Sequence, residues 1–131
     1  MVSVKINGYV FDNAYIEGRV IDSAWDSRES KSITLSDVTL QNIVDIFKND
    51  TPWSILITEV QDIPVVDDNG HIQTDENGEI VIQSVEHVDE YDNSEYSMLG
   101  DITIHPDGSV TVKMGKLTEL ETAYMQLIGG V

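Results

Sequence analysis

Carboxylates are the side chains in this sequence with the clearest capacity for chemistry. Two acidic tetrapeptides, Asp67-Asp68-Asn69-Gly70 and Asp75-Glu76-Asn77-Gly78, could offer the oxygen ligands that Ca²⁺ prefers. An EF-hand loop needs glycine at its sixth position and a bidentate glutamate at its twelfth, whereas glycine comes fourth in both tetrapeptides. Asn-Gly pairs favour tight turns because both residues tolerate a positive φ. The tetrapeptides therefore predict turns, and we expect no cofactor and no metal. A Ca²⁺-dependent adhesion or enzyme module is kept as a reserve hypothesis.

Histidine and serine residues form no recognisable catalytic pattern. His71, His87 and His105 do not fall into the HxH, HxxxH or HExxH spacings of metal sites. The sequence has no Gly-x-Ser-x-Gly elbow. It has no cysteine, and therefore neither a thiol nucleophile nor a thiolate zinc site. The sequence predicts a protein that is not an enzyme.

The charge of the chain restricts its partners. The formal net charge is −17, and eleven of the 24 acidic residues lie between Gln61 and Gly100, a stretch without Lys or Arg. Charge of this sign repels phosphate, so we expect no direct binding to nucleic acid and no membrane partner. It attracts basic protein surfaces, such as that of a nucleic-acid-binding host protein. The alternative is that the acidity simply keeps the chain soluble.

Two tyrosines next to the acidic stretch suit a binding surface. Tyr91 and Tyr96 flank a short acidic segment, and a tyrosine offers apolar ring area together with a hydroxyl that forms hydrogen bonds. We predict that the partner-binding residues are Asp67, Asp68, Asp75, Glu76, Glu79, Glu86, Asp89, Glu90, Tyr91, Asp92, Glu95 and Tyr96.

The length of 131 residues suits one domain, residues 1–131, with residues 61–95 as an acidic inserted arm. The longest apolar run is a handful of residues and is too short to cross a bilayer. The polar start, Met1–Lys5, is unlike a signal peptide. We therefore expect a soluble protein that is not secreted through a signal peptide.

The first half of the chain predicts strands. Asn7-Gly8 is typical of a type I′ hairpin turn, Gly18 indicates a β-bulge, and Trp25–Lys31 has the polar composition of a connection. The expected strands are Val2–Ile6, Tyr9–Phe11, Ala14–Ile21, a short strand containing Ile33 and Leu35, and Trp53–Val60.

One helix is expected between these strands. Leu40, Ile43, Val44 and Phe47 recur at the spacing of an amphipathic helix, which we place over 36–47. The two tryptophans lie on either side of it in the sequence. Trp53 opens an apolar strand and is expected in the core, whereas Trp25 lies among charged residues and suits either the core or a binding surface.

The acidic stretch predicts a β-ribbon or a loop. Ile80-Val81-Ile82 and Val85 could pair back across Ile63 and Val65-Val66. Two-stranded ribbons are marginally stable in isolation, so this segment is expected to be the most mobile part of the molecule.

The C-terminal part predicts a hairpin and a second helix. Strands Leu99–Ile104 and Val110–Met114 surround a turn with Pro106 and Gly108, and Thr118 with Glu121 forms a capping box. The following apolar stripe, which ends at Gly129-Gly130, contains Leu117, Leu120, Tyr124, Leu127 and Ile128. The fold class is therefore α+β: a mostly antiparallel sheet, two short amphipathic helices covering one face, and the acidic insertion.

Four segments resemble short uncharacterised proteins encoded by bacteriophages and prophages of Gram-positive bacteria: Trp25–Thr34, Trp53–Ile55, Tyr91–Tyr96 and Thr111–Gly115. The resemblance covers about a third of the chain and brings no catalytic residues. It implies a phage role, either as a virion or tail-region component or as an accessory factor, and a location in the host cytoplasm or the virion.

Two functions follow as hypotheses. The first is a nucleic-acid mimic, such as an anti-CRISPR or other anti-defence protein, that presents carboxylates to a basic nucleic-acid-binding protein. The alternative is a small virion or tail-associated structural protein that acts by self-assembly. The alternative predicts a homo-oligomer and exposed apolar patches larger than those of an ordinary monomer.

Overall fold

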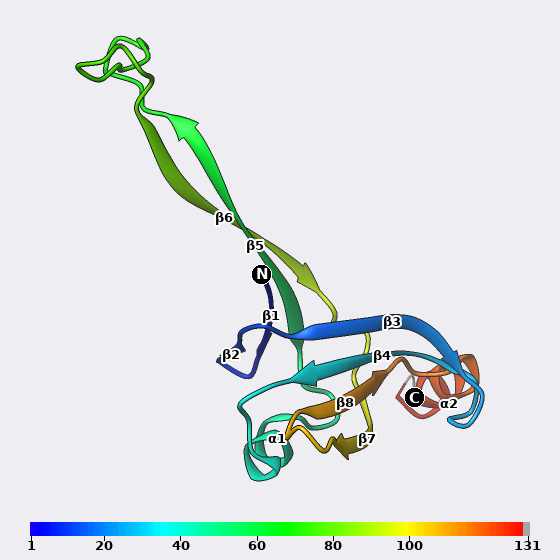
Figure 1. The fold of residues 1–131 in the computed structure, drawn as a ribbon. Coiled ribbons are helices and arrows are strands. Elements are labelled where there is room, and N and C mark those ends of the chain that lie inside the picture. The colour runs from blue at the N-terminus through cyan, green and yellow to red at the C-terminus, as the bar shows by residue number, and fades with distance from the viewer. Residues whose placement is uncertain (130–131) are drawn as a thin grey trace.

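The computed structural model describes residues 1–129 and contains two four-stranded sheets and two helices (Figure 1). The first sheet, in the order β2-β1-β5-β6, consists of β1 (Val2–Ile6), β2 (Tyr9–Phe11), β5 (Trp53–Pro64) and β6 (Ile82–Asp92). The second, in the order β3-β4-β8-β7, consists of β3 (Tyr15–Asp22), β4 (Arg28–Leu35), β7 (Met98–Ile104) and β8 (Val110–Gly115). Every strand pair is antiparallel, which confirms a mostly antiparallel α+β fold.

Local signals in the sequence located the turns correctly. Asn7 and Gly8 have φ values of 50° and 82°, and they join β1 to β2 as the Asn-Gly signal predicts. The register of β3 against β4 shifts between Gly18 and Val20, which confirms the bulge. Gly108 adopts a φ of 90° in the turn between β7 and β8. These features depend on a few neighbouring residues and need no tertiary information.

The prediction that Trp25–Lys31 is a connection is wrong. Strand β4 already begins at Arg28, which pairs with Asp22, and the turn is short because Asp26 and Ser27 both adopt positive φ values. Polar residues are tolerated in this part of β4 because Arg28 and Glu29 form ion pairs, and Ser30 and Lys31 form hydrogen bonds.

Side chains from both sheets and from α1 (Leu40–Ile46) form one core cluster. Its buried members are Val4, Ile6, Ile33, Leu35, Ile43, Ile46, Phe47, Trp53, Tyr96, Val110, Val112 and Met114. Trp53 is buried as predicted, and its indole N–H donates to the carbonyl of Tyr96 at 2.9 Å. Trp25 is half-buried on the second sheet.

Helix α1 is shorter than predicted and is rotated relative to the predicted stripe. Thr39 caps its start by accepting a hydrogen bond from the N–H of Asn42. Ile43 and Ile46 are buried, whereas Leu40 and Val44 of the predicted stripe are exposed. Because the helix is only two turns long, few of its side chains can reach the core. Those that do are Ile43, Ile46 and Phe47, which follows the helix.

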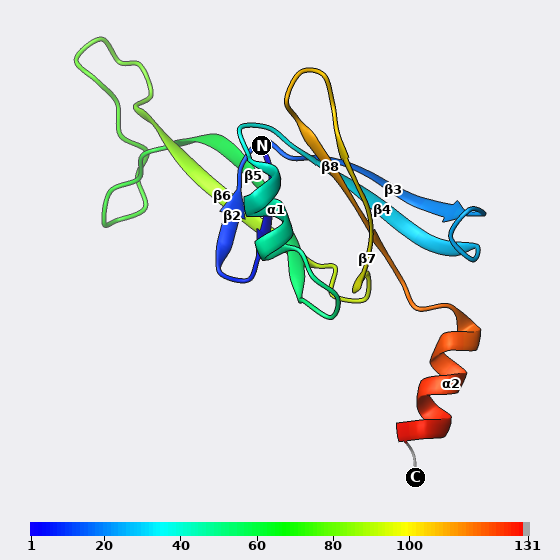
Figure 2. The same ribbon diagram turned by 90° about the horizontal axis from the view of Figure 1, so that it is seen from below.

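Helix α2 (Glu119–Gly129) has the predicted capping box. The N–H of Glu121 donates to Thr118 Oγ1 at 3.2 Å, and the N–H of Thr118 donates to Glu121 Oε1 at 2.9 Å. The prediction that both helices cover one sheet face is wrong for α2, which extends away from the end of β8 (Figure 2). Gly130 of the predicted helix end lies outside the described residues.

Strands β5 and β6 continue beyond the body as a long two-stranded arm (Figure 1). Strand β5 pairs with β1 from Trp53 to Ile57 and with β6 from Ser54 to Pro64. Within residues 1–129, the part from Thr58 to Pro64 has β6 as its one strand partner. The arm is therefore a direct extension of two strands of the first sheet.

Candidate functional site

Two matching turns form the tip of the arm. Asp67 and Asp75 each accept two backbone hydrogen bonds at 2.9 Å, from the residues two and four positions further along the chain. Gly70 and Gly78 have φ values of 81° and 79°. The two acidic tetrapeptides are turns, as predicted, and one carboxylate oxygen of each first aspartate shapes its turn.

At the tip, three chain segments meet at residues spaced eight positions apart in the sequence, Val65, Gln73 and Val81. The N–H of Val65 donates to the carbonyl of Val81, Val81 donates to Gln73, and Gln73 donates back to Val65, at 2.9 to 3.0 Å. This closed set of backbone bonds holds two small hairpins at the end of the arm. Exposed apolar side chains flank the junction: Val66, Ile72, Ile80 and Ile82.

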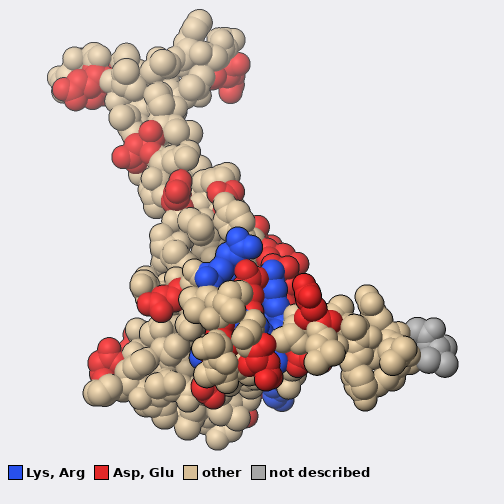
Figure 3. Space-filling view, turned by 90° about the vertical axis from the view of Figure 1, so that its right-hand side faces the viewer, with Lys and Arg blue, Asp and Glu red and all other residues tan. Residues whose placement is uncertain are grey.

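The carboxylates of the arm do not share one face. Side chains alternate between the two faces of a strand, and paired residues point to the same side. The register therefore places Asp62, Glu86, Glu90 and Asp92 on one face, and Glu59 and Asp89 on the other. In Figure 3 the acidic side chains are spaced along the arm among other residues.

Three predicted site residues near the base of the arm have local partners. Glu90 lies 3.5 Å from Lys5 Nζ, and Glu95 lies 3.5 Å from Lys116 Nζ. Asp92 accepts hydrogen bonds from the hydroxyl and the N–H of Ser94, which lower its pKa. At the base of the arm, two carboxylates are thus paired with lysines of the same chain, and a third accepts hydrogen bonds from a neighbouring serine.

The two tyrosines predicted for partner binding differ in exposure. Tyr91 is 53% exposed on β6 at the base of the arm, where it pairs with Ile55 of the first sheet. Tyr96 is 1% exposed, and its hydroxyl donates to Glu29 at 3.1 Å. The assignment of Tyr96 to a binding surface is therefore wrong. Its ring fills the core, which no local pattern in the sequence could show.

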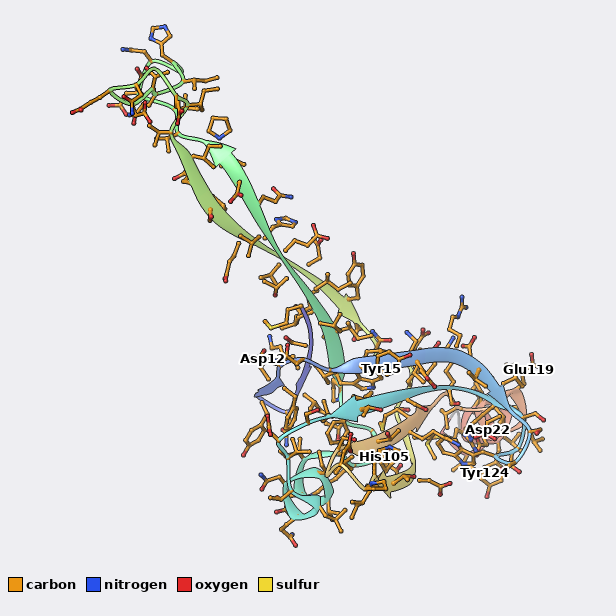
Figure 4. The ribbon with its side chains drawn as sticks, viewed as in Figure 1. Asp12, Tyr15, Asp22, His105, Glu119 and Tyr124 are labelled. Atoms are coloured by element: carbon orange, nitrogen blue, oxygen red, sulfur yellow. The ribbon has the colours of Figure 1, made fainter. Side chains whose placement is uncertain are left out.

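Helix α2 carries the apolar stripe that the sequence predicts to cover one face of the sheet. The large apolar residues of α2 are more than half exposed: Leu120, Tyr124, Met125, Leu127 and Ile128. Tyr124 and Glu119 project from α2 at the end of the second sheet where β3 ends in Asp22 (Figure 4). The helix is amphipathic as predicted, but its apolar side chains stay largely exposed and are not members of the core cluster.

One buried arginine anchors the first turn of α2. Arg28 is 3% exposed and forms two hydrogen bonds to the carboxylate of Glu121, at 2.7 and 2.9 Å. It also donates to the carbonyl of Lys116 at 2.8 Å, and its guanidinium lies 4.6 Å from the Trp25 ring centroid. The guanidinium lowers the pKa of Glu121 to about 2. This contact fixes where α2 begins.

Two glycines make room for the ring of Trp25. A Cβ added at Gly100 would lie 2.8 Å from the ring, and one added at Gly115 would lie 2.8 Å from the ring and 2.6 Å from Arg28 Cδ. The six-membered ring of the indole therefore lies close against β7 and β8, and Trp25 supports the arginine that holds α2. Of the two locations that the sequence allows for Trp25, the structure therefore shows packing within the protein and not an exposed binding surface.

We expect Gly115→Ala to lower the free energy of unfolding by about 1–2 kcal/mol, because the added methyl group displaces Trp25 and Arg28. Urea denaturation measures the change. In a Trp25→Ala background the same substitution should cost less, since one of the two obstructing side chains is gone. Equal costs in both backgrounds would contradict this account.

The histidines lie apart from one another. His71 Nδ1 is 3.8 Å from Asp67, His87 Nε2 is 3.1 Å from Asp89, and His105 Nε2 is 2.6 Å from Thr111 Oγ1. Among residues 1–129, no group of three or more His, Cys, Asp or Glu is placed to hold a metal ion. In the same part of the chain, no helix is long and apolar enough to cross a membrane.

Comparisons of the chain with protein-family models, with curated proteins and with solved structures found no match.

Proposed function

We propose that this protein is a non-enzymatic structural component of a phage particle, or of its tail region, and that it works by self-assembly. The observation that carries the proposal is the large amount of exposed apolar side chain on two projecting elements, the arm and α2. Monomeric proteins rarely expose large contiguous apolar patches, and such patches mark interaction sites.

The arm supports the proposal because both of its faces carry apolar side chains. Val60, Ile82 and Val88 lie on one face, and Ile63 and Val85 lie on the other. A two-stranded ribbon that buries neither face is marginally stable in isolation. Neighbouring copies that enclose the arm would bury both faces and stabilise it.

The outer edge of the arm supports the same conclusion. Within residues 1–129, β6 has no strand partner on the side away from β5. Free strand edges invite pairing with other chains, and charged side chains are one means of preventing this at the wrong time. We therefore interpret residues 61–95 as an acidic insertion whose apolar groups serve assembly and whose carboxylates prevent premature association.

The nucleic-acid mimic is the second candidate. The eleven acidic residues between Gln61 and Gly100, without any Lys or Arg, favour it. The carboxylates of β5 and β6 lie on both faces of the arm, which argues against the mimic, because a basic groove would contact those of one face only. The two candidates require different side chains on the same arm.

Matched variants of one face of the arm separate the candidates. Val60→Thr with Val88→Thr keeps the β-branched shape and removes apolar area, whereas Asp62→Asn with Glu86→Gln removes two charges from the same face. Self-assembly predicts about tenfold weaker association for the threonine pair and unchanged or stronger association for the amide pair.

Analytical ultracentrifugation of the full chain over a range of protein and salt concentrations measures this association. A mimic would instead show salt-sensitive binding to a purified RNA-guided nuclease, with binding lost in the amide pair and kept in the threonine pair. A chain that stays monomeric at every concentration would overturn the assembly proposal.

A further inference from the structure

The apolar side of α2 is large enough to form most of a dimer contact. Leu120, Tyr124, Met125, Leu127 and Ile128 are 81%, 63%, 58%, 74% and 58% exposed. If the lower part of the range for aromatic side chains, roughly 150–200 Å², is taken for all five, their exposed fractions amount to on the order of 600 Å² of surface. A specific interface of standard size buries roughly 800 Å² on each partner.

The same helix is where two copies can approach each other with little electrostatic repulsion. No residue from Thr122 to Gly129 carries a charge, although the chain as a whole has a net charge of −17. In the first turn, Glu121 is neutralised by Arg28. A basic partner would gain little from this uncharged stretch, whereas a second copy of the chain could bring its own uncharged stretch against it, with Glu119 on the other side of the helix. On the body side of the groove beside α2, Asp50 is the one carboxylate without an ion-pair partner among residues 1–129.

A groove beside α2 has a largely apolar lining that suits the exposed Leu127 and Ile128 of the helix. The groove has a volume of about 590 Å³, and it lies between the first part of α2 and the body. Its lining residues are Asn49, Asp50, Met98, Leu117, Leu120, Glu121, Tyr124 and Met125. Leu127 and Ile128, one turn further along the helix, extend beyond it.

We propose that α2 is the interface of a symmetric homodimer in which the two helices run antiparallel. Leu127 and Ile128 of each copy fill the groove of the other, so that the contact is reciprocal, as a two-fold axis requires. The groove and the free helix end complement each other within one chain, which favours a second copy as the occupant. This inference rests on the proposed self-assembly and names one of its interfaces.

Two adjacent positions of the helix give a matched test. Successive helical residues point about 100° apart, so Leu127→Glu places a charge within the apolar stripe, whereas Gln126→Glu places the same charge on the side that carries Glu119 and Thr122. We expect Leu127→Glu to raise the dissociation constant of the dimer about a hundredfold. Gln126→Glu should change it little. Sedimentation equilibrium measures both, and circular dichroism confirms that each variant is folded.

Disulfide trapping tests the orientation, because the natural chain has no cysteine. A chain with Leu127→Cys, mixed with a differently tagged chain with Met98→Cys, should form a mixed disulfide under mild oxidation. A chain with Asp107→Cys, on the turn between β7 and β8, is the control and should not be trapped. Leu127→Cys alone should not crosslink to itself, since antiparallel helices keep these positions too far apart for a disulfide.

The outcomes distinguish this inference from the proposed function. An oligomer that survives Leu127→Glu, or that traps Leu127→Cys with itself instead of with Met98→Cys, overturns the antiparallel α2 interface and leaves assembly through the arm standing. A wild-type chain that is monomeric at all concentrations overturns both.

Discussion

Trp53→Ala should lower the free energy of unfolding by about 4 kcal/mol, the largest effect that we expect from a single substitution in this chain. The indole is 1% exposed at the start of β5, so its removal leaves a large cavity in the core cluster shared by both sheets and α1. It also removes the donor to the carbonyl of Tyr96, which follows the end of β6. Total stabilities of domains are roughly 5–15 kcal/mol, so the change is a substantial fraction.

Urea denaturation followed by circular dichroism measures this loss. Tyr96→Phe is a suitable control, because it keeps an aromatic ring in the same core and removes the hydroxyl that donates to Glu29. The control should cost about 1 kcal/mol, the usual net value of one hydrogen bond. A Trp53→Ala loss no larger than that of the control would show that the two sheets do not depend on this core.

Glu121→Gln should lower the free energy of unfolding by about 3 kcal/mol, because it removes the charged partner that is hydrogen-bonded to the buried guanidinium of Arg28. The value lies at the lower end of the range for broken buried pairs, since Glu121 itself is partly exposed. Asp26 Oδ2 lies 3.6 Å from Arg28 Nη2, but its side chain is 80% exposed, so it replaces a small part of the lost interaction. Glu119→Gln, a charge loss in the same helical turn, is the matched control and should have little effect.

Acid should reproduce this loss in the natural chain. Arg28 lowers the pKa of Glu121 from 4.5 to about 2, so the carboxylate stabilises the folded state fully above pH 4.5. This contribution declines as the pH falls toward 2, because the carboxylate then becomes protonated in the folded state as well. The stability difference between the natural chain and Glu121→Gln should therefore shrink from pH 5 to pH 2. A difference that is independent of pH would contradict the ion-pair explanation.

The arm and α2 together suggest how an acidic chain can be built to assemble. On the arm, each face carries both carboxylates and apolar side chains. Electrostatic repulsion and apolar attraction between copies would therefore act on the same surface. On α2, the apolar residues from Tyr124 to Ile128 lie in a stretch without charge. We therefore expect contacts through α2 to depend less on salt than contacts through the arm, where screening of the carboxylates should favour association.

The sequence by itself determined the parts of this protein that depend on near neighbours. The Asn7-Gly8 hairpin, the bulge at Gly18, the acidic turns of the arm and the Thr118–Glu121 capping box were all predictable, because a few consecutive residues contain the whole set of hydrogen bonds and φ values. The alternation of apolar residues likewise predicted most strands.

The tertiary structure alone decided which of these surfaces are covered. An apolar stripe shows that a helix has one hydrophobic side. Whether that side is buried depends on the element that packs against it, which is formed by residues far away in the chain. Tyr96 is therefore buried although it follows an acidic run, and Leu127 is exposed although it lies in an apolar stripe. The division of the arm's carboxylates between two faces likewise follows from strand register, which residue counts along the sequence do not fix.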